Sequence, residues 1–132
     1  MTTPRYPLAI IGAGALGLHF ASRLSACGPL AVVARSEARA AVLRAGVQVG
    51  EAGFRPDAFG PATLPEADWV IVLVKAGDTV DAARTALAMQ PRGVLSLQNG
   101  LIEEVLREVC GRVAVGQGIT TEAAFRDGER VL

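Results

Sequence analysis

The chain has 132 residues, 51% of them hydrophobic, and its 13 basic and 13 acidic residues give a net charge of zero. This length fits one domain that folds without a disulfide or a metal ion. Because the arginines are scattered and the longest apolar run (residues 69–74) is far too short to span a bilayer, we expect neither a nucleic-acid-binding nor a membrane protein, but a cytoplasmic one.

The first half of the chain alternates between apolar runs and helical patterns. Residues 8–11 predict a strand, and residues 15–25 predict a helix whose buried stripe is Leu16, Phe20 and Leu24. A second strand is expected at 30–34, followed by a helix that Ser36 caps and Gly46 ends. The pattern over residues 47–61 is weaker and predicts two short strands, around Val47 and at Phe54.

The second half continues the alternation. Residues 69–74 predict a fully buried strand, and Asp78 is expected to cap a helix over residues 79–89 that Pro91 ends. A strand at 94–97, a helix at 102–109 and a strand at 113–115 follow. Residues 120–125 are predicted to be extended, and residues 126–129 to form a hairpin turn. This order predicts a single α/β domain of the Rossmann type, with a doubly wound, mostly parallel sheet and helices on both faces.

A glycine-rich loop connects the first strand to the first helix. Its residues are Gly12, Ala13, Gly14, Ala15, Leu16 and Gly17. Gly12 permits a tight turn, Gly14 lets the backbone approach a pyrophosphate, and Gly17 allows close packing of the helix on the sheet. The helix N-terminus offers free N–H groups to phosphate oxygens. The loop therefore predicts a dinucleotide-binding site.

The residues after the second strand indicate which dinucleotide binds. NAD-binding domains usually carry an acid there, which accepts the ribose hydroxyl groups, but this chain has Arg35 and Ser36. A guanidinium group suits a 2′-phosphate, and the serine hydroxyl can donate a further hydrogen bond. We therefore expect NADP as the cofactor. In the alternative, Arg35 is a solvated arginine and Glu37 accepts the ribose.

Further along the chain, the sequence resembles the ketopantoate reductases (2-dehydropantoate 2-reductases). The similarity lies in G-A-G-A-L-G at 12–17, A-R at 34–35, V-L-V-K at 72–75, Q-N-G at 98–100 and T-E-A-A-F-R-D-G at 121–128. The resemblance implies that Arg35 binds the 2′-phosphate of NADPH and that Lys75 and Asn99 line the cleft near the nicotinamide, where they serve catalysis and cofactor binding. Thr120 and Thr121 match a threonine-rich strand that either packs or lines the cleft.

In this family a second, helical domain follows the nucleotide-binding one. The resemblance implies that it supplies the lysine that protonates the keto group of a 2-keto acid and a glutamate that holds the substrate. Lys75 is the only lysine of the present chain, so we expect residues 1–132 to be the NADP-binding domain without that helical domain, and to be inactive alone. We also expect self-association as a homodimer or larger species, through the edges at 120–125 or 131–132.

Two other functions remain open from the sequence. Rossmann domains of this length also serve as nucleotide-sensing regulatory modules, and 6-phosphogluconate-type dehydrogenases begin with a similar half. His19, the only histidine, is expected to be a surface or packed residue of the first helix. Cys27 and Cys110 lie far apart and are expected to be reduced thiols without a function.

Overall fold

Strand β1 (Arg5–Ile11) is the centre of the fold, and its last three residues are buried among neighbours on both faces. The computed structural model describes residues 3–74, 76–97, 103–111, 113–118, 126–127 and 130–131. Five more strands join β1 in one sheet: β2 (Leu30–Val33), β5 (Asp57–Phe59), β6 (Glu66–Val72), β7 (Gly93–Ser96) and β8 (Ala114–Gln117).

Every neighbouring pair in this sheet is parallel, and the strand order is β5-β2-β1-β6-β7-β8. The chain first moves from β1 toward β5 and then returns to add β6, β7 and β8 on the other side of β1. This arrangement confirms the predicted doubly wound Rossmann-type sheet. The helices are α1 (Ala15–Leu24), α2 (Glu37–Ala45), α3 (Thr79–Ala88) and α4 (Glu103–Cys110), with short 3₁₀ turns at Ser25–Cys27 and Ala76–Asp78.

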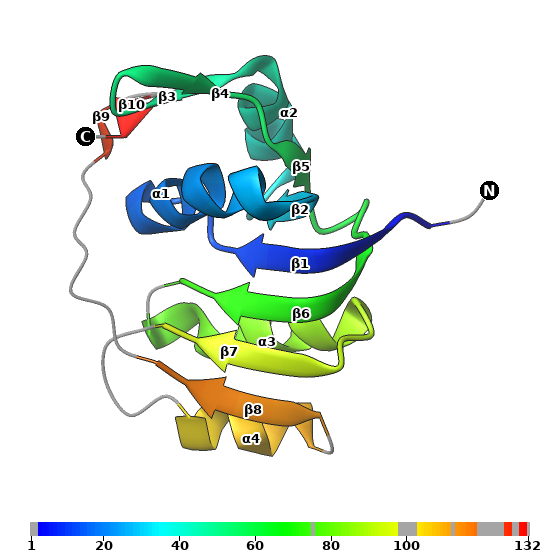
Figure 1. The fold of residues 1–132 in the computed structure, drawn as a ribbon. Helices are drawn as coiled ribbons and strands as arrows, with labels where there is room; N and C mark the ends of the chain where they lie inside the picture. The colour runs from blue at the N-terminus through cyan, green and yellow to red at the C-terminus, as the bar shows by residue number, and fades with distance from the viewer. Residues whose placement is uncertain are drawn as a thin grey trace.

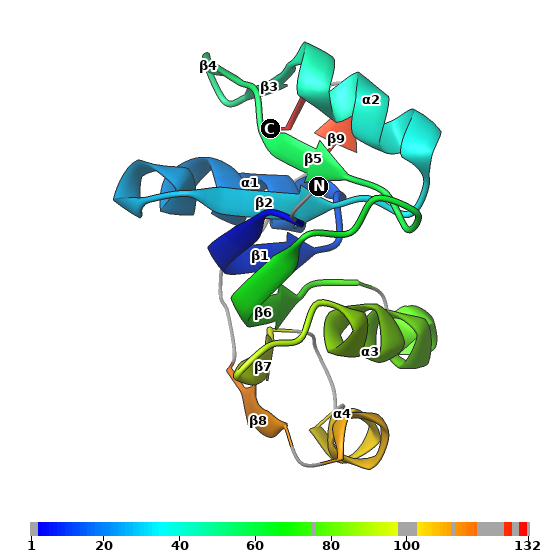
Figure 2. The same ribbon diagram turned by 90° about the vertical axis from the view of Figure 1, so that its right-hand side faces the viewer.

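The helices lie on both faces of the sheet. Figure 2 shows α1 on one face and α3 and α4 on the other. Two apolar cores result. The first joins the sheet to α3 and α4 through Val70, Val94 and Leu106, and the second joins it to α1 and α2 through Leu18 and Leu43. Among the described residues, no helix is long and apolar enough to cross a membrane.

The buried stripe of α1 differs from the predicted one. Gly17, Leu18 and Ala21 are its buried residues, whereas Leu16, Phe20 and Leu24 are only half-buried. The two small residues let the helix lie close to the sheet, so the larger side chains flank the contact instead of filling it. Two neighbouring expectations are confirmed: the Ser36 hydroxyl caps α2 by accepting from the Arg39 N–H at 3.1 Å, and Gly46 ends α2 at a φ of 120°.

Two predictions about the second half of the chain are wrong. The strand around residue 70 is not buried throughout, because the Trp69 side chain is 55% exposed and its ring lies over Gly93 of β7. Figure 1 shows no described helix over the face of β6, β7 and β8 that lies opposite α3 and α4. Asp78 precedes α3 but its side chain makes no capping hydrogen bond, because the 3₁₀ turn before α3 replaces the extended backbone of a capping residue.

Strand β5 was not predicted. It has three residues between Pro56 and Gly60, so it carries too little apolar pattern to be recognised. Its place at the sheet edge is fixed by tertiary contacts. The Tyr6 hydroxyl donates to the Asp57 carboxylate at 3.0 Å, and the Tyr6 ring packs edge-on against Phe59. Burial, followed by the Asp57 carboxylate, raises the pKa of Tyr6 to about 12.

A second, small sheet has the order β4-β3-β10-β9, from β3 (Val47–Val49), β4 (Ala52–Phe54), β9 (Arg126–Asp127) and β10 (Arg130–Val131). The antiparallel pair β9–β10 confirms a hairpin here, but Arg126 and Asp127, which were predicted to lie in its turn, form β9. Val131 is buried, and its carbonyl accepts from the Gly50 N–H at 2.8 Å. Because β10 pairs with β3, Val131 is not the free edge that we expected to mediate self-association. Residues 120–125 lie outside the described residues.

Candidate functional site

The carboxyl ends of four parallel strands lie together at one edge of the large sheet. Ile11 of β1 is in register with Val33 of β2 and with Val72 of β6, and Val72 is in register with Ser96 of β7. The order of the strands reverses between β1 and β6. In open α/β sheets this reversal, at the carboxyl ends of the strands, is where ligands bind. The loops that leave these strands therefore form the candidate site.

Two glycines let the first loop turn back on itself. Gly12 has a φ of 121°, and a side chain there would lie 2.6 Å from the carbonyl oxygen of Leu73 after β6. A Cβ on Gly17 would collide with the carbonyl oxygen of Gly12. The first turn of α1 is thus packed directly against the backbone that leaves β1. Any side chain at position 17 would separate the helix from the loop.

Gly14 is in a different environment. It is exposed, it precedes α1, and a Cβ built on it would have no neighbouring atom within 4 Å. The first turn of α1 carries no acidic residue, and the capping position makes no side-chain hydrogen bond. The N–H groups of this turn therefore keep their positive field, with open space in front of Gly14. Ala13, Ala15 and Leu16 beside it are half-buried. An anionic group such as a pyrophosphate fits here.

Arg35 follows the end of β2 and is exposed. Among the described residues, its guanidinium group has no ion-pair partner, whereas Arg5 binds Asp68 at 2.8 Å and Arg92 lies 4.0 Å from the same carboxylate. The Ser36 oxygen accepts a hydrogen bond from Arg39, but its own proton remains available for donation. The pair Arg35 and Ser36 can therefore bind a second anionic group near the first.

Glu37 is the nearest acid to Arg35 in the sequence, and its carboxylate binds elsewhere. It accepts hydrogen bonds from the Ala62 N–H at 2.8 Å and from the Thr63 hydroxyl at 3.1 and 3.3 Å. Both donors belong to the loop between β5 and β6. The structure therefore weighs against the alternative in which Glu37 accepts the ribose hydroxyl groups. Neither Gly60 nor Thr63 belongs to a recognisable motif, so the sequence of this loop carries no signal of the contact.

Several residues implied by the family resemblance fall outside the described part of the chain, namely Lys75, Asn99, Thr120 and Thr121. Their described neighbours Val74 and Leu97 are half-buried and follow β6 and β7 at the candidate edge. His19 is half-buried on α1, with its ring 5.7 Å from that of Phe20. Cys27 is exposed and Cys110 buried, both as free thiols, and burial raises the pKa of Cys110.

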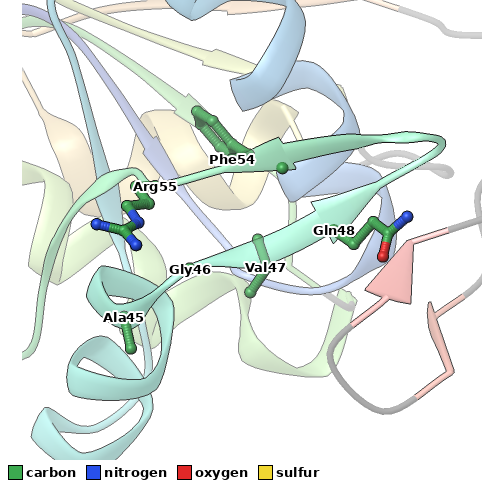
Figure 3. Close-up of a pocket in the computed structure, with 7 residues that line it drawn as sticks. Ala45, Gly46, Val47, Gln48, Phe54 and Arg55 are labelled. Atoms are coloured by element: carbon green, nitrogen blue, oxygen red, sulfur yellow. The ribbon is translucent and has the colours of Figure 1, made fainter.

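A hollow lies away from this edge, between the end of α2 and the β3–β4 hairpin. Its volume is about 910 Å³, and the side chains of Gln48, Phe54 and Arg55 contribute to its lining. Figure 3 shows that Gln48 and Arg55 point away from each other, so their polar groups do not meet at one point. Size alone would favour this hollow as a site. The combination of helix N-terminus, open glycine and unpaired arginine favours the glycine loop instead.

Comparison with known proteins shows the family of the chain. The sequence profile of the ketopantoate reductase PanE/ApbA family matches residues 8–132 and so includes both the glycine loop and Arg35. The chain belongs to this family. The match favours the oxidoreductase lineage over a regulatory module or a 6-phosphogluconate-type enzyme. No curated protein matches the chain significantly.

Solved structures show the same fold. A protein assigned as a 2-dehydropantoate 2-reductase from Enterococcus faecalis is 26% identical with a TM-score of 0.78, and the match covers 94% of this chain and 44% of that one. The corresponding protein from Bacillus subtilis is 25% identical with a TM-score of 0.75, covering 94% and 45%. D-mandelate dehydrogenase in a complex with NADH and anilino(oxo)acetate has a TM-score of 0.81 at 19% identity, covering 94% and 44%. The chain thus spans less than half the length of these proteins.

The contrast between Gly14 and Gly17 predicts different effects of the same substitution. Gly17→Ala forces backbone atoms apart, so we expect a loss of about 1–3 kcal/mol in the free energy of unfolding. Gly14→Ala meets no neighbour and should cost less than about 1 kcal/mol. Chemical denaturation followed by circular dichroism measures both. Equal losses in the two variants would contradict the proposed packing of α1 on the loop.

Proposed function

We propose that this chain is the NADP-binding part of a ketopantoate reductase-type oxidoreductase, which reduces a 2-keto acid such as 2-dehydropantoate to its 2-hydroxy acid with NADPH. The observation that carries the proposal is Arg35, which follows β2 at the same sheet edge as the glycine loop, is exposed, and has no ion-pair partner among the described residues. The nearby carboxylate of Glu37, which would repel a 2′-phosphate, is bound to another loop. The site thus favours a ligand with two anionic groups.

Each part of the candidate site receives a role in this proposal. The backbone of Gly12, Ala13, Gly14, Ala15, Leu16 and Gly17 binds the pyrophosphate, assisted by the N-terminus of α1. Arg35 forms charge-assisted hydrogen bonds to the 2′-phosphate, and Ser36 donates a further one. Following the family resemblance, Lys75 and Asn99 hold the ribose and the substrate near the nicotinamide. When bound, the reduced nicotinamide supplies the hydride.

The proposed setting is the cytoplasm. An exposed cysteine, Cys27, and a buried one, Cys110, are both free thiols, which is typical of a reducing compartment. The substrate is proposed only by lineage, since the chain corresponds to less than half of each solved relative. We therefore propose that a helical domain, of the kind that follows in the family, supplies the proton donor and the surface that binds the 2-keto acid.

The first prediction from this proposal concerns cofactor choice. Without its charge-assisted phosphate contact, a nucleotide loses roughly 1.5–3 kcal/mol, so NADPH should bind about tenfold to a hundredfold more tightly than NADH. Arg35→Asp should reverse this order, because the new carboxylate repels the phosphate and accepts the ribose hydroxyl groups. Calorimetric titration with both nucleotides measures the ratio. Equal affinities in the parent chain would refute the role of Arg35.

Gly14→Val, which fills the open space before α1, should bind neither nucleotide while keeping the fold.

The second prediction concerns activity. Residues 1–132 alone should bind NADPH yet oxidise it with 2-keto acids at no more than the background rate. A positioned proton donor contributes typically about 10²–10⁴-fold, and substrate orientation contributes more. NADPH absorbance at high protein concentration, with a panel of 2-keto acids, tests this. Activity that appears when a helical domain is supplied in trans would support the division of labour. If the chain alone turns over a 2-keto acid and Lys75→Ala abolishes that turnover, the proposed division of labour between the two domains is wrong.

A further inference from the structure

The loop between β5 and β6 and the first residue of α2 form a closed hydrogen-bond network. The Thr63 hydroxyl donates to the Glu37 carboxylate at 3.1 and 3.3 Å and accepts from the Gly60 N–H at 3.1 Å. The Ala62 N–H donates to Glu37 at 2.8 Å, and the Thr63 N–H donates to the Gly60 carbonyl at 3.2 Å. The loop is thereby folded around one carboxylate, which accepts hydrogen bonds from two of its donors.

Gly60 provides the space that the Glu37 carboxylate occupies. It is buried, and a Cβ built on it would clash with the carboxylate of Glu37, whose atoms are its three nearest neighbours. The carboxylate can therefore occupy this place only because residue 60 has no side chain. The backbone of Gly60 has no positive φ, so the space and not the conformation requires glycine.

The position of this network matters because Glu37 is only two residues beyond Arg35. A carboxylate at the end of the second strand of a Rossmann fold is the feature that accepts the ribose hydroxyl groups of NAD and repels the 2′-phosphate of NADP. This chain has such an acid within reach in sequence, yet the loop at 60–63 turns it away from the exposed guanidinium, with which it forms no ion pair among the described residues.

We propose that the Gly60–Thr63 loop is a specificity determinant: by sequestering the Glu37 carboxylate it keeps the site beside Arg35 positive and selective for NADPH. The inference rests on the proposed function and extends it from Arg35 to a residue that contacts no cofactor. Glu37 affects specificity without contacting the cofactor. Its negative charge weakens NADPH binding when its carboxylate is released from the loop.

Gly60→Ala tests this most sharply. The added methyl group displaces the Glu37 carboxylate, which is the far end of a flexible side chain, but does not remove its negative charge. We expect the ratio of NADPH to NADH affinity to fall by about tenfold at low ionic strength, because the released carboxylate can approach and repel the 2′-phosphate. The fall should diminish as salt is added. Thr63→Val, which removes the two side-chain hydrogen bonds, should act in the same direction with a smaller effect.

The matched control is the double variant Glu37→Ala/Gly60→Ala. If the released charge lowers the ratio, Gly60→Ala should have no effect on it in the Glu37→Ala background. A merely structural loop would give the opposite pattern: both nucleotides would weaken equally, and the effect of Gly60→Ala would persist without Glu37. An unchanged ratio in Gly60→Ala and Thr63→Val, with a parent chain that prefers NADPH, overturns this inference alone. A parent chain that binds neither nucleotide overturns the proposed function and this inference together.

Discussion

The close packing of Gly17 against the carbonyl of Gly12 is the constraint on which the candidate site depends. It forces α1 to begin at the carboxyl end of β1, where the strand is buried, and it aims the helix N-terminus at the edge where the strand order reverses. The positive φ of Gly12 and the open space in front of Gly14 then complete a cradle for an anion. A side chain at Gly17 would move the helix, and the field at its N-terminus would be lost to the ligand. A side chain at Gly12 would push the loop away from the backbone of Leu73.

Arg35 and Glu37 show how one short segment can carry two opposite signals. Arg35 lies between β2 and α2, and Glu37 begins α2. In this account the chemistry of the site depends on which of the two faces the nucleotide. In the structure the Glu37 carboxylate is bound by another part of the chain, through Ala62 and Thr63. Cofactor preference in this account is therefore a tertiary property. It depends on the exposed guanidinium of Arg35 and on the carboxylate of Glu37, which is hydrogen-bonded to another loop.

The parts of the fold that were predictable are those with local patterns. Strands appear at the apolar runs of β1 and β2, the cap forms at Ser36, and the glycine loop joins β1 to α1 as predicted. Strand β6 was also predicted, but it covers Glu66–Val72 instead of residues 69–74. Strand β5 could not be found because three residues between Pro56 and Gly60 have no periodicity. The exposure of Trp69 could not be foreseen either, since it depends on which side of β6 the helices cover. The contact of Glu37 with the loop joins residues 25 and 26 positions apart, without a motif at either end.

The most direct test of the account is to locate the nucleotide on the chain. Amide chemical shifts of the ¹⁵N-labelled protein, followed during titration with NADPH, report the contact residue by residue. We predict the largest changes at the backbone of residues 13–17 and at Arg35 and Ser36, with no change in the hollow between α2 and the β3–β4 hairpin. Changes centred on Gln48, Phe54 and Arg55, with the glycine loop unaffected, would contradict the account.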